Sequence, residues 1–131
     1  MIVGVGFDLV EIARAERLLD GKGERALARL FTTAEVEYAT ARARPGMHLA
    51  ARLAAKEAAF KALAGSESAR LIGWKDIEVI SRPGHAPELV LHGRAAQRAE
   101  VLGVRRHWLT LSHTDSTAGA VVVLEAGPAA E

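Results

Sequence analysis

Two acidic side chains stand where they could support catalysis. Asp8 follows an apolar segment that contains two glycines, and Glu57 lies inside an alanine-rich segment, residues 49–65. A buried carboxylate without a partner is strongly destabilising, so Glu57 needs a cation nearby. Lys61, four residues further on, can serve, and so can a metal ion. Mg²⁺ suits one or two carboxylates completed by water and substrate phosphates, so Asp8 and Glu57 are candidate Mg²⁺ ligands.

Basic side chains on the same segment are typical of phosphate binding. Arg52, Lys56 and Lys61 would supply positive charge to phosphate groups. Arg52 and Lys56 are four residues apart, where like charges on a helix repel, so an anion shared between them would relieve that repulsion. Glu57 and Lys61 have the spacing of an ordinary ion pair on a helix surface, and this simpler interpretation stays open. Together the groups indicate phosphoryl or nucleotidyl transfer.

A hydrolytic triad is not predicted. Ser112, His113 and Asp115 are close in sequence, but neighbouring residues on a strand point to opposite faces, so Ser112 and His113 cannot easily meet. His113 could be a structural histidine bonded to the backbone, a ligand or a base. Asp115 could add a carboxylate near a metal or simply belong to a turn.

Length and composition narrow the class of protein. The 131 residues predict a single domain over residues 1–125 and a loose C-terminal tail over residues 126–131. A net charge of +1 argues against nucleic-acid binding through bulk charge. The absence of cysteine excludes a thiol nucleophile and a disulfide scaffold and suits a reducing compartment. We find neither a signal peptide nor a membrane-spanning run and expect a cytoplasmic protein with no nucleic-acid or membrane partner.

The segment that carries Glu57 must be a helix, because alanine, leucine, lysine and glutamate are strong helix formers and Gly65 is suited to its end. One side of this helix carries only alanines, which lets another backbone come close: Ala51, Ala54, Ala55, Ala58 and Ala62. Residues 2–7 alternate as a strand, with Gly4 and Gly6 on the same face as Asp8. The bare glycine face could leave room for a ligand or allow the alanine face to pack against it.

Asp8 also has a structural interpretation. With Glu11 three residues later, it matches the capping-box pattern of a helix over residues 9–19. Arg14 and Arg17 would project from that helix, and a short helix over residues 25–30 adds Arg25. The exposed arginines could form a local basic patch.

The rest of the chain predicts further helices and strands. A second capping box, Thr32 to Glu35, predicts a helix to about residue 42. Strands are predicted at residues 74–80, 88–92, 107–113 and 118–125, with a helix at 93–102 between the second and third. The predicted fold class is α+β, with a mainly antiparallel sheet packed against a long central helix.

The ordered motifs together resemble a known family. They are GxDLVEIxR at residues 6–14, RLAAKEAAFKAL at 52–63, WKDIEV at 74–79, and LSHT followed by AxAVVV at 111–123. This combination resembles the holo-acyl-carrier-protein synthases, small single-domain phosphopantetheinyl transferases, over nearly the whole chain. The family has a different, glycine-rich sequence where residues 64–73 stand here, beside the expected coenzyme site.

The resemblance implies transfer of phosphopantetheine from coenzyme A to a serine of an apo acyl carrier protein, with Mg²⁺ as cofactor and adenosine 3',5'-bisphosphate as the second product. It implies that Asp8 and Glu57 are metal ligands and that Lys61 contacts the pyrophosphate. Arg52 and His113 would contact coenzyme A from a neighbouring subunit, and Lys56 is the further predicted coenzyme contact. The base that deprotonates the serine stays open between a metal-held water, Asp8 and His113.

The resemblance also implies partners. Members of the family are commonly homotrimers with the site at the subunit boundary, and they act in fatty-acid and lipid metabolism. Arg14, with Arg17 and Arg25, would form the docking surface for the acidic carrier.

Two rival hypotheses use the same residues: a magnesium-dependent nucleotide phosphohydrolase, and a noncatalytic acyl-carrier-binding subunit.

Overall fold

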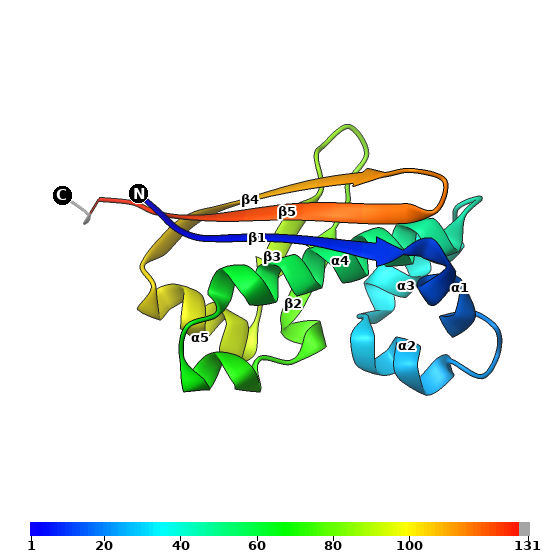
Figure 1. Ribbon diagram of the computed structural model, residues 1–131, viewed down its shortest axis with the longest axis horizontal. Helices are drawn as coiled ribbons and strands as arrows, with labels where there is room; N and C mark the ends of the chain where they lie inside the picture. Colours follow the sequence, from blue (N-terminus) through cyan, green and yellow to red (C-terminus); the bar gives the residue numbers. More distant parts are fainter. Residues whose placement is uncertain (129–131) are drawn as a thin grey trace.

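A three-stranded antiparallel sheet lies along the long helix α4 (Pro45–Leu63) in the computed structural model, which describes residues 1–128 (Figure 1). The strands follow the order β1 (Ile2–Glu11), β5 (Thr117–Ala126), β4 (Val104–His113). Pairing of the first and last strands brings the two ends of the described chain together, and the Met1 amino group donates to the Ala126 carbonyl. The predicted α+β class and antiparallel sheet are confirmed.

Helix α4 begins earlier than the alanine-rich segment, because Pro45 takes its first position, where a missing N–H costs nothing. Thirteen of its nineteen residues are buried, so it forms the centre of the core. Gly65 follows the helix with a φ of +111°, a conformation that favours glycine, as the sequence predicts.

The glycine face of β1 packs directly on the alanine face of α4. A Cβ atom at Gly4 would collide with the carbonyl oxygen of Ala62, and one at Gly6 with that of Ala58. The bare face therefore serves close packing of strand on helix and holds no ligand. This contact places the next inward-facing residue of β1, Asp8, over the same helix.

Three short helices cover one end of α4: α1 (Ile12–Leu18), α2 (Glu24–Leu30) and α3 (Thr33–Thr40). The capping box of α3 is confirmed, since Thr32 and Glu35 exchange side-chain and backbone hydrogen bonds. The capping box at Asp8 is wrong. Strand β1 continues to Glu11 because it pairs with β5 over its whole length, and α1 starts only at Ile12.

The remaining segments cover the other end of the helix. A hairpin of β2 (Ile77–Ile80) and β3 (Glu88–Leu91) forms a second, separate sheet, and α5 (Gly93–Val101) follows it. The start of the predicted strand at 74–80 is instead a turn of 3₁₀ helix, Trp74–Asp76, and a second one, Glu67–Leu71, occupies the loop at 64–73. No helix among residues 1–128 is long and apolar enough to cross a membrane.

The outer face of the three-stranded sheet carries large apolar side chains in solvent. Val5, Phe7 and Leu9 on β1 and Trp108 on β4 are each more than half exposed. Strand β5 includes Ala126, which the sequence places in the tail; residues 129–131 lie outside the described part of the chain.

Candidate active site

The two predicted acidic residues meet between the sheet and the long helix. Asp8 comes from the middle of β1, and Glu57 comes from α4. Lys61 lies one turn after Glu57, and its Nζ is 3.0 Å from Asp8 Oδ1 and donates to the Phe7 carbonyl at 3.0 Å. Arg14 Nη1 of α1 lies 3.4 Å from Glu57 Oε1. Each carboxylate is therefore paired with one cation, Asp8 with Lys61 and Glu57 with Arg14. The ion pair between Glu57 and Lys61 that their spacing allows does not form.

The acidic pair has unusual protonation properties. Burial and the adjacent Asp8 carboxyl raise the pKa of Glu57 to about 7, against the lowering effect of Arg14. Burial opposes the ionisation of Asp8, but hydrogen bonds from Glu57 and Lys61 lower its pKa below the ordinary value. Near neutral pH Asp8 is thus ionised while Glu57 is only partly so, as expected for two acids in contact without a metal ion.

The site fits a magnesium ion. Asp8 Oδ2 is buried and has no hydrogen-bond partner, so one carboxylate oxygen is free to bind a cation. No group of three or more acidic or histidine side chains that could hold a metal occurs among residues 1–128. Two carboxylates leave the other ligand positions to water and phosphate, which is the arrangement Mg²⁺ prefers. Asp115 is exposed in the turn between β4 and β5, so its turn assignment is confirmed.

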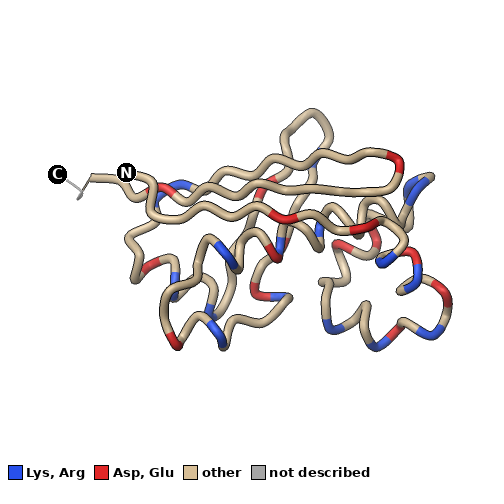
Figure 2. Tube along the Cα trace, in the orientation of Figure 1, with Lys and Arg blue, Asp and Glu red and all other residues tan. Residues whose placement is uncertain are grey.

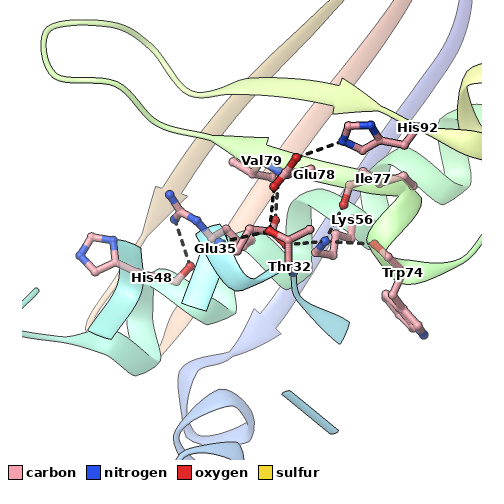
Figure 3. Close-up of polar contacts among 10 residues, drawn as sticks. Thr32, Glu35, His48, Lys56, Trp74, Ile77, Glu78, Val79 and His92 are labelled. Atoms are coloured by element: carbon pink, nitrogen blue, oxygen red, sulfur yellow. Dashed lines mark hydrogen bonds and ion pairs between the residues drawn. The ribbon is translucent and has the colours of Figure 1, made fainter. Parts of the chain in front are cut away.

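The side of α4 that carries Arg52 and Lys56 faces into the protein. Lys56 is fully buried and forms an ion pair with Glu35 of α3, at 2.8 Å between Nζ and Oε1 (Figure 3). Its Nζ also donates to the carbonyls of Trp74 and Ile77. Glu35 thus supplies an anion to Lys56 from the chain itself, whereas Arg52 lies beyond ion-pair distance of any carboxylate in the described chain. Lys56 has no free donor or exposed surface for a ligand, which contradicts its predicted contact with coenzyme A.

Arg52 and His113 line one cavity of about 380 Å³, as their shared predicted role requires. Its walls come from α3, α4, the loop between β2 and β3, and the end of β4. The polar lining residues that the sequence did not single out are Tyr38, His48, Ser81, Arg82, His85 and Thr110. Sequence motifs do not reveal them, because they lie in four separate segments and become neighbours only in the fold. Within one protomer this cavity does not include the acidic pair.

The remaining sequence candidates take simpler positions. Ser112, His113 and Asp115 share no side-chain hydrogen bond in the described chain, and His113 Nδ1 bonds to the neighbouring Thr114 carbonyl. Arg14, Arg17 and Arg25 lie exposed on α1 and α2, and each helix also carries one glutamate, Glu16 or Glu24 (Figure 2). Arg14 also reaches Glu57, so the predicted docking surface adjoins the acidic pair.

Comparisons with known proteins match one family over most of the chain. The family described as the 4'-phosphopantetheinyl transferase superfamily matches residues 4–120. A holo-[acyl-carrier-protein] synthase of Anaeromyxobacter dehalogenans is 50% identical over 128 residues, covering 95% of this chain and 97% of that protein. One from Koribacter versatilis is 45% identical over 125 residues, covering 95% and 99%.

A solved structure shows the same fold. The holo-(acyl-carrier-protein) synthase of Bacillus anthracis, solved in complex with CoA (3',5'-ADP), superposes with a TM-score of 0.75. It is 30% identical, and the alignment covers 97% of this chain and 99% of that one. The similarity therefore extends over nearly the whole chain.

Proposed function

This chain belongs to the 4'-phosphopantetheinyl transferase superfamily, and from that membership we infer that it acts as a holo-acyl-carrier-protein synthase. It transfers phosphopantetheine from coenzyme A to a serine of an apo acyl carrier protein and releases adenosine 3',5'-bisphosphate. The observation that carries this inference is the cluster of Asp8, Glu57 and Lys61, which combines an acidic pair with an exposed ammonium group. A cytoplasmic location and a role in fatty-acid synthesis belong to the same proposal.

The chain's own groups divide the work of the transfer. Asp8 and Glu57 would hold Mg²⁺, which supplies charge neutralisation for the pyrophosphate when bound. Lys61, whose side chain is 57% exposed, can turn from Asp8 to a phosphate oxygen. The serine oxygen attacks the phosphorus that carries the pantetheine arm, and the bond from that phosphorus to the bridging oxygen breaks. The serine proton passes to a base, for which the chain itself offers Asp8 and His113.

The first experiment is intact-mass analysis of an apo acyl carrier protein incubated with this protein, coenzyme A and Mg²⁺. One added phosphopantetheine that a chelator abolishes would support both the reaction and the metal. Glu57→Gln, which keeps the shape of the side chain, should remove nearly all transfer while leaving the melting temperature close to that of the parent. Full activity in Glu57→Gln would contradict the metal assignment. Hydrolysis of coenzyme A without transfer would favour the phosphohydrolase alternative.

We further propose a homotrimer in which neighbouring protomers complete each active site. The outer sheet face supports it, since Val5, Phe7 and Trp108 expose apolar surface that a monomer would leave in water. A hollow of about 200 Å³ on this face is lined by Phe7, Leu9 and Val121 and extends to His113, which also lines the cavity with Arg52. A ring of heterologous contacts could therefore bring His113 and Arg52 of one protomer to the acidic pair of the next.

Sedimentation equilibrium tests the assembly. Val5→Asp places a charge on the outer face without touching the acidic pair, so it should yield monomers and lose transfer activity together. Lys75→Asp, an exposed change away from that face, is the matched control and should remain trimeric. A parent protein that sediments as a monomer at all concentrations while transferring at full rate would refute the shared site.

The basic surface on α1 and α2 is the proposed docking site for the carrier, because local charge complementarity steers association even when net charge is near zero. Arg17→Glu changes an exposed residue with no side-chain partner among those described. The KM for the carrier should rise several-fold at low salt and approach that of the parent at high salt, while the KM for coenzyme A stays constant. Equal rises in both KM values would argue against a docking role.

A further inference from the structure

One aromatic ring holds two guanidinium groups beside the cavity that Arg52 and His113 line. The Cζ atom of Arg42 lies 3.3 Å from the centre of the Tyr38 ring, and that of Arg52 lies 4.2 Å from it. The imidazole of His48 meets the same ring edge-on, with the two ring centres 5.7 Å apart. Guanidinium groups at these distances are attracted by the electrons of the ring face.

The other contacts of Arg52 are also with uncharged groups. Its Nη1 donates to the His48 carbonyl at 3.3 Å, and its Nη2 donates to Ser81 Oγ at 2.8 Å. No carboxylate of the described chain lies within ion-pair distance of Arg52; Glu35 attracts its charge from further away and is paired with Lys56. Although only 2% of Arg52 is exposed, its guanidinium group is therefore held in place without a direct ion pair.

Holding a cation by a ring has a different consequence from holding it by a carboxylate. A carboxylate would cancel the field of the guanidinium at short range, whereas a neutral ring fixes its orientation and leaves its net charge. Arg42 repels the charge of Arg52, whereas the carboxylate of Glu35 attracts it from beyond ion-pair distance and is itself paired with Lys56. The cavity therefore has an ordered guanidinium group without an ion-pair partner in its wall, which favours a phosphate-bearing ligand.

We propose that Tyr38 is a positioning residue for coenzyme A binding, which it supports by holding the guanidinium of Arg52 against its ring. This proposal rests on the proposed function, in which Arg52 contacts coenzyme A. Tyr38 acts through Arg52 and takes no part in the chemistry. The ring face is the important feature, so phenylalanine should replace tyrosine, while an aliphatic side chain of similar size should not.

The test compares Tyr38→Leu and Tyr38→Phe in the full-length protein by calorimetric titration with coenzyme A and by transfer kinetics. Tyr38→Leu should raise the Kd and KM for coenzyme A roughly 3–30-fold, the range that the loss of one cation–π contact predicts. Its kcat at saturating coenzyme A should stay within about twofold of the parent, because the reacting groups are untouched. Tyr38→Phe should match the parent in both parameters.

Thr32→Ala is the matched control, since it removes the cap of the same helix α3 and has no contact with Arg52. It should lower the melting temperature and leave the Kd for coenzyme A unchanged. If it weakens binding as much as Tyr38→Leu does, Tyr38 merely stabilises the helix and the proposal is wrong. The proposal is equally wrong if Tyr38→Phe weakens binding as much as Tyr38→Leu, which also decides the matter should the leucine variant fail to fold.

Arg52→Met separates this inference from the function on which it rests. If Arg52→Met weakens coenzyme A binding and Tyr38→Leu does not, the positioning role fails and the proposed function stands. If Arg52→Met leaves binding unchanged, the assignment of Arg52 to coenzyme A is itself wrong, and the role of Tyr38 falls with it.

Discussion

Replacing Lys56 by methionine tests whether this lysine belongs to the core or to the active site. Met has a similar length and no charge, so the change removes the ammonium group with little change in packed volume. The substitution leaves the Glu35 carboxylate in a fully buried position without its cation, and it leaves the Trp74 and Ile77 carbonyls without this donor.

The expected loss of stability can be worked from these contacts. Removing one partner of a buried ion pair typically costs about 3–5 kcal/mol, because the remaining charge stays away from water. Glu35 keeps its bonds from the backbone N–H groups of Thr32 and Val79, at 2.9 Å each, which favours the lower half of that range. For a domain of this size the loss corresponds to a melting temperature roughly 10–20 °C lower.

Thermal and urea unfolding at a fixed protein concentration measures the loss, and a second lysine on the same helix provides the control. Lys61→Met removes an ion pair from a side chain that is 57% exposed, which should change the free energy of unfolding by less than about 1 kcal/mol. Transfer activity should follow the opposite order below the melting temperature: lost in Lys61→Met and largely kept in Lys56→Met. Unchanged stability in Lys56→Met, together with a higher KM for coenzyme A, would refute the structural role and restore Lys56 to the coenzyme site.

Two further predictions concern the acidic pair and its support. In metal-free protein the pKa of Glu57 is raised to about 7 from 4.5, so Glu57 binds a proton on folding between these pH values. The free energy of unfolding, measured by urea titration, should therefore fall by about 1–3 kcal/mol as pH rises from 4.5 through 7. Saturating Mg²⁺ should abolish this pH dependence. A slope of the opposite sign would show that Glu57 is ionised without metal. Gly6→Ala should lower the free energy of unfolding by about 1–3 kcal/mol, because the new Cβ atom collides with the Ala58 carbonyl. In the control Gly73→Ala the new Cβ atom lies 3.5 Å from Asp76 Oδ2, an ordinary contact, so this variant should have the melting temperature of the parent.

The sequence correctly predicted the features that depend on residues close together along the chain. The helix that carries Glu57, the capping box at Thr32 and the pairing class of the sheet all follow from residue type and spacing, and the structure confirms them. The same reasoning failed at Asp8, where the sequence predicts a helix cap and the structure has a strand. Strand pairing with β5 satisfies the backbone of residues 8–11 more completely than one side-chain cap could, and that pairing partner is more than a hundred residues away.

The basic residues of α4 show the same limit. Helical periodicity placed Arg52 and Lys56 on one edge and predicted an anion between them, but it could not say that the anion would be Glu35 of α3. Nor could it show that Tyr38, rather than a carboxylate, would hold Arg52.

By itself the sequence determined the kind of chemistry, because two carboxylates, a following lysine and the motifs around them depend on residue identity and short spacing. Only the tertiary structure decided which charges are available to a ligand. Arg52, Lys56 and Lys61 look alike along the chain, yet Lys61 is open to solvent, Lys56 is neutralised in the core and Arg52 is held charged against a ring. Burial and the choice of partner arise from segments distant in sequence, and they set whether a charge binds a substrate or stabilises the fold.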